Sequence, residues 1–418
     1  MEQLTQAQKG FHILAKPTGP ICNLDCEYCF YTEKEALFSG NPAFRMSDEV
    51  LESFIKKYID TQRTPEVPFV WQGGEPTLIG LDFYKKVVQL QKKYANGKKI
   101  ENSLQTNGTL LDEEWCKFLA KHQFMVGLSL DGPKFIHDRY RVDRGQRPTF
   151  HKVMKALSLL KQYRVEFNVL TCVTKESSKF PLEIYRFFKE QGVRFIQFIP
   201  IVERTSNTEA EGWGLRHAAP SSPKQDNVHR EVTAWTVEPE TYGDFLIQIF
   251  EEWVRKDVGD IHVMNFEWAL TSWLGLESNI CIFSKSCGQA VVMEHNGDVY
   301  SCDHYVYPSY KLGNIVSDQP DEMIDSKEQQ AFGASKKADL PKECQSCEVR
   351  FACHGECPKR RFQKSVSGEP GLNYLCAGYK KYFHHIHPYM KVMVQLINNN
   401  LPASMVMDAI KSPLVIKM

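Results

Sequence analysis

The sequence predicts an α/β fold: a partial barrel of six strand–helix units followed by a small domain stapled by metal clusters. Short apolar runs typical of strands alternate with amphipathic helical patterns through the first half of the chain. This alternation indicates a parallel sheet with right-handed crossovers. Six units are fewer than the eight of a closed barrel, so we expect an open barrel with its site at the C-terminal ends of the strands. From Cys281 onward the composition changes, because cysteines become frequent and the strand-like runs shorten.

The expected strands are short and rich in β-branched or aromatic residues, as buried parallel strands are. They are Phe11–Lys16, Pro68–Trp71, Asn102–Thr106, Phe124–Leu130, Phe167–Val173 and Phe195–Ile199. The expected helices are Ser47–Ile59, Asp82–Tyr94, Asp112–Lys121, Thr149–Tyr163, Phe180–Gln191 and Pro239–Lys256. Ser47 is a suitable N-cap, since acidic residues follow it in the first turn and apolar residues recur at helical spacing.

The predicted domain organisation has four parts. Residues 1–235 form the partial barrel, with a polar surface insertion at 203–235 that shows no clear period. Residues 236–280 form a linking helical segment, 281–390 the metal-stapled domain with two clusters, and 391–418 a C-terminal tail. Within the third part, Asn296-Gly297 between Gln289–Met293 and Val299–Ser301 predicts a β-hairpin.

Composition excludes several classes of protein. The 51 Lys and Arg balance the 51 Asp and Glu, so no basic stripe indicates a nucleic-acid partner. Residues 1–10 lack the apolar core of a signal peptide, and no run of about 18 apolar residues indicates a membrane span. We therefore expect a cytoplasmic protein without a membrane partner.

Three cysteines directly follow the first expected strand. Cys22, Cys26 and Cys29 have the spacing C-x3-C-x2-C, which suits three irons of a [4Fe–4S] cluster and leaves the fourth iron open. Such a cluster binds S-adenosylmethionine and transfers one electron to it, which releases a 5′-deoxyadenosyl radical. Structural zinc needs four ligands, and three cysteines cannot make two disulfides, so both alternatives are weaker.

Eight further cysteines lie in the C-terminal part, enough for two complete four-ligand sites. They are Cys281, Cys287, Cys302, Cys344, Cys347, Cys353, Cys357 and Cys376. Two structural zinc sites are the alternative, because Cys344-Gln-Ser-Cys347 is a plausible zinc knuckle, but iron–sulfur is favoured beside the first cluster. We expect the two remaining cysteines, Cys116 and Cys172, to be small buried apolar residues.

Polar residues follow three successive expected strands and are expected to face one pocket. They are Gln72-Gly73-Gly74-Glu75, Gln105-Thr106-Asn107-Gly108 and Ser129-Leu130-Asp131-Gly132. Gly73 and Gly74 let the backbone approach a ligand closely, and Glu75 is expected to accept hydrogen bonds from an ammonium group. We expect Asn107, Ser129 and Arg141 to contact the same ligand, with Arg141 bidentate to a carboxylate; Arg139 and Arg144 compete for that role.

Asp303 adjoins Cys302 just after the predicted hairpin. A carboxylate beside a cofactor can act as a general base when a substrate proton comes within reach. The alternative, equally weighted from the residues alone, is a role in orienting the cluster loop.

Together these motifs resemble the anaerobic sulfatase-maturating enzymes, which are radical S-adenosylmethionine (radical SAM) proteins with a SPASM-type C-terminal domain. The resemblance runs from Phe11 to Ile386 and includes Trp71-Gln72-Gly73-Gly74-Glu75-Pro76 and Cys344-x2-Cys347-x5-Cys353-x3-Cys357. It implies a partial (β/α)6 barrel of the radical SAM type, S-adenosylmethionine and three [4Fe–4S] clusters. It also implies oxidation of a Cys or Ser in a sulfatase C/S-x-P/A-x-R motif to Cα-formylglycine, with an unfolded sulfatase segment as partner and flavodoxin or ferredoxin as electron donor.

The resemblance assigns roles to individual residues. Asp303 is the base, and Tyr31 and Gln72 lie near the peptide substrate. One auxiliary cluster is held by Cys281, Cys287, Cys302 and Cys357, and the other by Cys344, Cys347, Cys353 and Cys376.

Two other functions compete. SPASM-type peptide maturases share the radical core and form thioether or carbon–carbon cross-links, but they often carry a leader-binding domain, for which the residues before Phe11 are too few. A metal-stapled electron carrier is the non-enzymatic alternative, and it has no use for an open iron.

Overall fold

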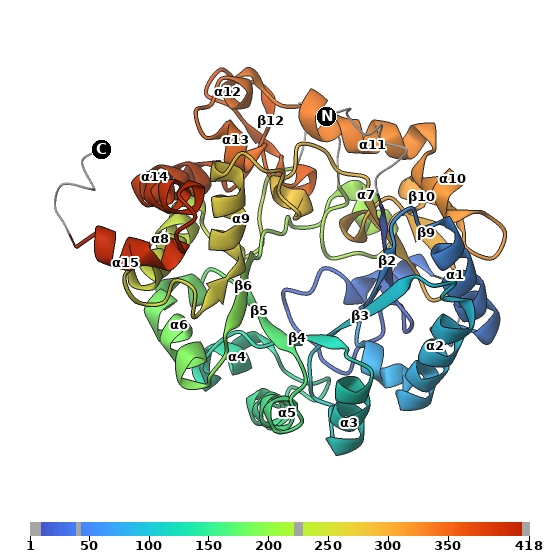
Figure 1. The fold of residues 1–418 in the computed structure, drawn as a ribbon. Helices are drawn as coiled ribbons and strands as arrows, with labels where there is room; N and C mark the ends of the chain where they lie inside the picture. Colours follow the sequence, from blue (N-terminus) through green and yellow to red (C-terminus); the bar gives the residue numbers. More distant parts are fainter. Residues whose placement is uncertain (1–9, 39–42, 221–228, 412–418) are drawn as a thin grey trace.

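A ten-stranded sheet forms the centre of the computed structural model, which describes residues 10–38, 43–220 and 229–411. The strand order is β10-β9-β8-β1-β2-β3-β4-β5-β6-β7. The first six strands along the chain lie side by side in sequence order and pair in parallel, with helices on the outside (Figure 1). The predicted partial (β/α)6 barrel is therefore confirmed.

The strands and helices of the barrel match the expected runs closely. The strands are β1 (His12–Ala15), β2 (Glu66–Trp71), β3 (Lys99–Thr106), β4 (Met125–Ser129), β5 (Phe167–Val173) and β6 (Phe195–Pro200). The helices between them are α1 (Asp48–Thr61), α2 (Leu81–Tyr94), α3 (Glu113–Lys121), α4 (Lys134–Tyr140), α5 (Phe150–Gln162) and α6 (Pro181–Glu190). Only the short α4 has no counterpart among the expected helices, since seven residues give too little periodicity.

Helix α1 shows how the sequence fixes these elements. Ser47 is the N-cap, as expected, and its hydroxyl accepts a hydrogen bond from the Val50 N–H at 3.2 Å. The apolar face of α1 is buried, and the Tyr58 hydroxyl on that face contacts the carbonyl oxygens of Phe11 (3.1 Å) and Pro68 (3.0 Å). Helix α1 thus contacts the backbone both just before β1 and within β2.

The segment after β6 is more structured than expected. Residues 203–235 include α7 (Thr208–Gly212) and the bridges Arg204↔Val232 and Thr205↔His217, and both Arg204 and His217 are buried. This part is therefore not a simple surface insertion; its residues 221–228 lie outside the described part. α8 (Pro239–Lys256), β7 (His262–Val263) and α9 (Met264–Trp273) follow, and β7 adds a seventh parallel strand beside β6.

The C-terminal part continues the same sheet. β8 (Ala290–Met293) and β9 (Asp298–Tyr300) form the predicted hairpin, and β10 (Lys311–Asn314) pairs with β9. β8 also pairs in parallel with β1, from His12↔Ala290 to Ala15↔Met293. The two predicted domains therefore share one hydrogen-bonded sheet rather than merely touching.

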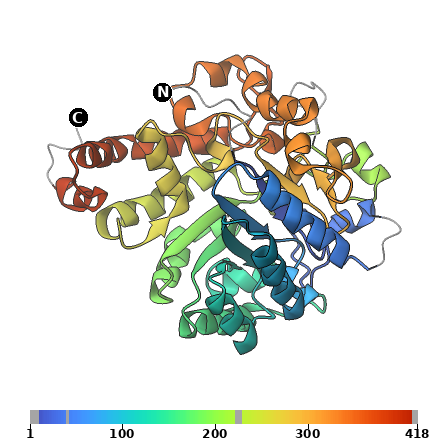
Figure 2. The ribbon, with the colours of Figure 1, turned by 45° about the vertical axis from the view of Figure 1, so that its right-hand side comes forward.

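Six α-helices and two short strands complete the C-terminal part (Figure 2). They are α10 (Pro320–Ile324), α11 (Lys327–Ala338), α12 (Lys342–Gln345), α13 (Arg350–Cys353), β11 (Gln363–Lys364), β12 (Pro370–Leu372), α14 (Cys376–Asn398) and α15 (Val406–Ala409). The boundary expected after residue 390 falls inside α14, which packs on α8 where Gly378 faces Gly243. Residues 391–398 thus continue this helix, and residues 1–9 and 412–418 lie outside the described part.

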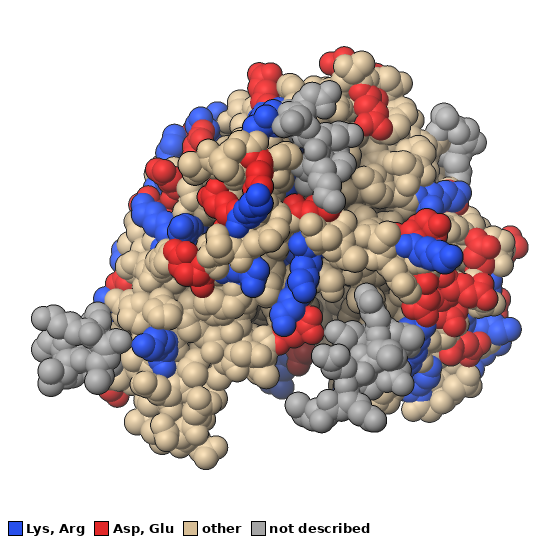
Figure 3. Space-filling model, turned by 90° about the horizontal axis from the view of Figure 1, so that it is seen from above, with Lys and Arg blue, Asp and Glu red and all other residues tan. Residues whose placement is uncertain are grey.

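The surface carries no large area of one charge on the face seen in Figure 3, where Lys and Arg alternate with Asp and Glu. This distribution agrees with the balanced charge of the sequence. No helix of the described residues is long and apolar enough to cross a bilayer.

Candidate active site

A cavity of about 300 Å³ opens at the C-terminal ends of β1 to β6. Every residue expected to bind the cofactor, the peptide or the first cluster lines it, and so does Asp303 from the C-terminal part. These residues are Cys22, Cys26, Cys29, Tyr31, Gln72, Gly73, Gly74, Glu75, Asn107, Ser129, Arg141 and Asp303. Sequence reasoning gave no role in this cavity to the polar lining residues Lys16, Tyr28, Thr32, Cys172 and His304.

The three N-terminal thiols point into this cavity from one loop. Cys22 and Cys26 are buried, and Cys29 is half-buried. The Leu24 N–H donates to the Cys22 sulfur at 3.3 Å, and the Asn107 amide donates to it at 3.7 Å. Burial raises the pKa of Cys22 to about 12, and the Cys29 thiol adds to the rise. Buried thiols of this kind ionise only beside positive charge, which the irons of a cluster supply, so the donor set fits a [4Fe–4S] group.

Gly74 lets two backbone segments approach each other closely. A β-carbon on Gly74 would lie 2.1 Å from the Ile21 carbonyl oxygen. The Gly74 N–H donates to Gly19 at 2.8 Å and the Glu75 N–H to Ile21 at 2.9 Å. The segment that Gly74 approaches is the one that leads into the cysteine loop, and contact of Gly74 with a ligand stays a prediction.

Glu75 fastens the ends of two strands together. Its carboxylate is fully buried and accepts hydrogen bonds from the Thr77 N–H (3.0 Å), the Thr77 and Thr106 hydroxyls (2.6 and 2.7 Å) and the Asn107 N–H (2.8 Å). Burial raises the pKa of this carboxyl, and the four donors oppose that rise. The described contacts of Glu75 therefore all go to the protein, although it also lines the cavity.

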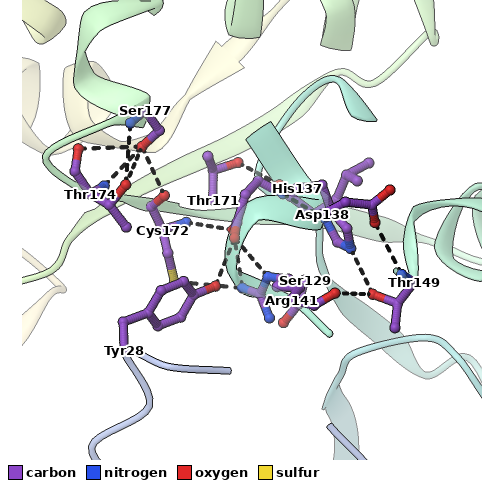
Figure 4. A network of polar contacts seen from close by, with 12 residues as sticks. Tyr28, Ser129, His137, Asp138, Arg141, Thr149, Thr171, Cys172, Thr174 and Ser177 are labelled. Carbon is purple, nitrogen blue, oxygen red and sulfur yellow. Dashed lines mark hydrogen bonds and ion pairs between the residues drawn. The ribbon is translucent and has the colours of Figure 1, made fainter. Parts of the chain in front are cut away.

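Arg141 forms a bidentate pair with the carboxylate of Asp131. Figure 4 shows Arg141 beside Tyr28 and Cys172. The Nε of Arg141 donates to Asp131 Oδ2 at 2.8 Å and its Nη2 to Oδ1 at 3.1 Å. The Tyr28 hydroxyl and the Cys172 N–H donate to the same carboxylate at 2.7 and 2.9 Å. The Cys172 sulfur also accepts from Arg141 Nη2 at 3.5 Å, so this thiol is more than an apolar filler.

The two arginines that were alternatives to Arg141 for binding a ligand carboxylate lie elsewhere. Arg139 is exposed on α4, and the Nε of Arg144 donates to the Cys22 carbonyl oxygen at 2.8 Å. The Ser129 hydroxyl accepts from the Gln105 amide at 3.1 Å. Arg141 and Ser129 thus line the cavity floor as parts of a bonded network.

Asp303 and Lys16 form an ion pair at the edge of the cavity. Lys16 Nζ pairs with Asp303 Oδ1, and the side chains are 1% and 25% exposed. Burial raises the pKa of Asp303, but Lys16, His304 and Lys359 outweigh burial, so the pKa lies below its usual value. Lys16 also lies over the Tyr31 ring, 3.1 Å from its centroid. The sequence offered one signal for Lys16, a charge at the end of an apolar strand.

The eight C-terminal thiols fall into two groups. Burial raises the pKa of Cys281, Cys287 and Cys357 to about 11, and in each case another thiol of this set adds to the rise. Cys302 lies with them, since Cys281 and Cys357 contribute to its raised pKa.

The second group is Cys344, Cys347, Cys353 and Cys376. Burial raises the pKa of Cys353 and Cys376 to about 12, and Cys344 adds to both. The pKa of Cys344 rises to about 11, with a contribution from Cys347. The resemblance implied the same two sets of four, and their assignment to two clusters stays a prediction. Within the described residues no three His, Cys, Asp or Glu side chains converge on one metal ion; the ligands of a four-iron cube stand further apart.

His304 and Lys336 lie beside the first group. His304 lines the cavity, and its Nδ1 is 3.6 Å from the Cys357 sulfur. Lys336 Nζ donates to the Ile282 carbonyl oxygen at 2.9 Å and also to that of Cys281. A cluster held by four thiolates carries net negative charge, which a buried ammonium offsets.

Comparisons with known proteins agree with this geometry. The family model of the radical SAM superfamily matches residues 17–188, and that of an iron–sulfur cluster-binding (SPASM) domain matches residues 281–348. The chain is 47% identical over 404 residues to a serine-type anaerobic sulfatase-maturating enzyme of Bacteroides thetaiotaomicron, with 96% of each chain covered. It is 34% identical to a cysteine-type enzyme of Clostridium perfringens, covering 93% of this chain and 98% of that one.

Solved structures show the same likeness. The structure of anSMEcpe with bound S-adenosylmethionine (AdoMet) and the Cp18Cys peptide superposes with a TM-score of 0.79 at 34% identity, covering 92% of this chain and 99% of that one. Streptococcus suis SuiB bound to S-adenosylmethionine gives 0.57 at 15% identity, covering 88% and 75%, which shows a shared fold alone.

Proposed function

The chain belongs to the anaerobic sulfatase-maturating enzymes, and we propose that it oxidises a Cys or Ser in a sulfatase C/S-x-P/A-x-R segment to Cα-formylglycine without oxygen. One observation carries the proposal: a single cavity joins the three-cysteine loop of the barrel to Asp303 of the C-terminal part. A radical source and a proton acceptor thus face the same space, as a two-hydrogen oxidation requires.

Some of the cavity residues are assigned to the cofactors and others to the substrate. We assign Cys22, Cys26 and Cys29 to the cluster that, when bound, supplies one electron to S-adenosylmethionine and so produces a 5′-deoxyadenosyl radical. Gly73, Gly74, Glu75, Asn107, Ser129 and Arg141 shape the part of the cavity assigned to S-adenosylmethionine. Tyr31 and Gln72 lie near the substrate segment, and Asp303 takes the proton of its hydroxyl or thiol.

The two C-terminal thiol groups are assigned to auxiliary [4Fe–4S] clusters. Cys281, Cys287, Cys302 and Cys357 hold one, and Cys344, Cys347, Cys353 and Cys376 hold the other. His304 lines the cavity and contacts Cys357 of the first group. This proximity suits the cluster assigned to that group to accept the second electron of the oxidation.

We propose serine as a substrate residue of this enzyme. Its relative of 47% identity is named serine-type, as are two Klebsiella relatives of 36–37% identity, whereas the cysteine-type relatives are 33–35% identical. A flavodoxin or ferredoxin supplies the electron for the first cluster. We place the reaction in the cytoplasm, where a sulfatase segment is accessible before it folds or is exported.

The test is reconstitution without oxygen, with reductant, S-adenosylmethionine and paired Ser-x-Pro-x-Arg and Cys-x-Pro-x-Arg peptides. Mass spectrometry follows peptide and 5′-deoxyadenosine together. We expect loss of two hydrogens, an aldehyde that reacts with hydrazine, and matching 5′-deoxyadenosine. The same mass loss without hydrazine reactivity would instead identify a cross-linking peptide maturase.

Two variants test the assignments. Cys26→Ala should abolish 5′-deoxyadenosine, because the first cluster loses a ligand. Asp303→Asn should keep all clusters and lose aldehyde; wild-type aldehyde rates in this variant would refute the base assignment.

A further inference from the structure

We propose that Lys16 is a positioning residue of the oxidation: its buried ammonium holds Asp303 at the cavity edge and offsets the negative charge that forms on the substrate oxygen. This inference rests on the proposed function and adds a residue to it.

The energetics of Lys16 argue for a role in the reaction. Its side chain is 1% exposed, at the end of a strand, and it lines the cavity together with its partner Asp303. Burying an ammonium costs several kcal/mol unless it is paired. The carboxylate supplies that pair but keeps 25% of its own surface accessible, so the pair is open toward the cavity on one side.

Hydrogen bonds at the end of β8 hold both Lys16 and the Tyr31 ring in place. The Lys16 N–H donates to the Met293 carbonyl oxygen at 2.9 Å, at the end of β8. The next residue, Glu294, accepts the Tyr31 hydroxyl at 2.5 Å, and the Tyr31 ring lies under the Lys16 ammonium. Glu294, Tyr31, Lys16 and Asp303 therefore form one row in which carboxylates lie at both ends and the cation lies between them.

The Lys16 ammonium in this row can stabilise the negative charge that moves during the reaction. The cluster that Cys22, Cys26 and Cys29 would hold, together with S-adenosylmethionine, would supply a 5′-deoxyadenosyl radical, so one hydrogen atom of the substrate β-carbon would end in a C–H bond of 5′-deoxyadenosine. Asp303 takes the hydroxyl proton, so the O–H electron pair stays on the substrate oxygen. One electron then leaves to an auxiliary iron–sulfur group, and the carbon–oxygen bond becomes the aldehyde double bond.

During these steps the negative charge moves from Asp303 to the substrate oxygen. The Lys16 ammonium lies next to that path, so the negative charge keeps a positive neighbour at each step. A serine hydroxyl is much less acidic than a cysteine thiol, whose pKa is about 8.5. Serine oxidation should therefore depend more strongly on Lys16 than cysteine oxidation does.

The experiment compares Lys16→Met, Lys16→Arg and Lys34→Met in the reconstituted enzyme. Lys34 is a matched control, because it is another buried lysine over a tyrosine ring, 3.2 Å from the centroid of Tyr307, but it does not line the cavity. The readouts are aldehyde per 5′-deoxyadenosine for the paired serine and cysteine peptides, the peptide Kd by fluorescence anisotropy, and the visible absorption of the clusters.

With Lys16→Met we expect unchanged cluster absorption, a peptide Kd within about twofold of wild type, and continued 5′-deoxyadenosine formation. Aldehyde per 5′-deoxyadenosine should fall by about tenfold or more for serine and by less for cysteine. Lys16→Arg should restore much of the serine ratio, and Lys34→Met should keep the wild-type ratio.

A wild-type serine ratio in Lys16→Met would overturn the proposal. So would a parallel loss of both products, or of cluster absorption, that Lys16→Arg does not restore, because Lys16 would then only hold the fold. The wild-type arm tests the parent proposal separately: no aldehyde from either peptide would remove the proposed function, and this inference with it.

Discussion

Lys34 should destabilise the folded protein, and replacing it with methionine should stabilise it. Lys34 lies on the 3₁₀ helix η2 (Thr32–Leu37), next to the cysteine loop, and is 1% exposed. Among the described residues its Nζ has no hydrogen-bond partner, and it lies over the Tyr307 ring. Burial, reinforced by the positive charge of Lys359, lowers the pKa of Lys34 from 10.5 to about 7.

The lowered pKa of Lys34 determines how much this residue destabilises the folded protein and how that cost depends on pH. A shift from 10.5 to about 7 corresponds to about 5 kcal/mol of destabilisation, since each pKa unit is worth about 1.4 kcal/mol. The full cost applies below about pH 7, where the folded protein must bury the ammonium. Between about pH 7 and 10.5 the unfolded chain binds more protons than the folded one, so the cost shrinks as pH rises.

Lys34→Met removes the charge and keeps an unbranched side chain that is one heavy atom shorter. It also loses a cation–π contact worth about 1–2 kcal/mol. We therefore expect the free energy of unfolding to rise by about 2–4 kcal/mol near pH 6, and this gain to shrink by about 2–3 kcal/mol by pH 9.

The assay is urea unfolding of the cluster-loaded protein without oxygen, followed by circular dichroism near pH 6 and pH 9. Lys56→Met, at an exposed position of α1, is the control and should change stability by less than about 0.5 kcal/mol. The urea dependence of the unfolding free energy should stay the same in all variants. A loss of stability in Lys34→Met at pH 6, or an equal gain at both pH values, would refute the reasoning.

Three further predictions concern the site. Gly74→Ala places a β-carbon 2.1 Å from a backbone carbonyl oxygen, so it should cost about 1–3 kcal/mol or more and lower the iron content of the first cluster. Arg141→Met leaves the buried Asp131 carboxylate without its cation and should cost about 3–5 kcal/mol in urea unfolding, whereas the exposed Arg139→Met should be nearly neutral. Asp303→Asn should lower the aldehyde yield from both peptides at equal 5′-deoxyadenosine, and any aldehyde that remains should come mainly from the cysteine peptide; a higher residual yield from serine would contradict its role as the proton acceptor.

Local pattern predicted the barrel well, because apolar spacing reports burial directly. The strand Phe167–Val173 matches β5 residue for residue, and Ser47 caps α1 as its position indicated. The continuity of the sheet was not predictable in this way. Pairing of β1 with β8 joins residues almost 280 positions apart, and nothing local in either strand specifies the other.

The same limit applies to the candidate site. Arg141 was identified, but its partner Asp131 belonged to another motif and was not considered as the ligand of the guanidinium. Lys16 and Asp303 meet only because the sheet places the hairpin of β8 and β9, which leads into Asp303, beside β1. Residue types at strand ends can be read from the sequence, whereas the pairs they form depend on tertiary structure.

The pairing of β1 between β2 and β8 has a consequence for how the enzyme can be divided. A fragment ending before residue 281 would leave β1 as an open edge, with unpaired backbone groups ready to bind another chain. Such a fragment should aggregate rather than act as an independent radical domain. The spacing between the cysteine loop and Asp303 is likewise set by hydrogen-bond register, so it cannot drift as it would across a flexible linker. The proposed proton acceptor therefore keeps a fixed place relative to the loop assigned to the first cluster.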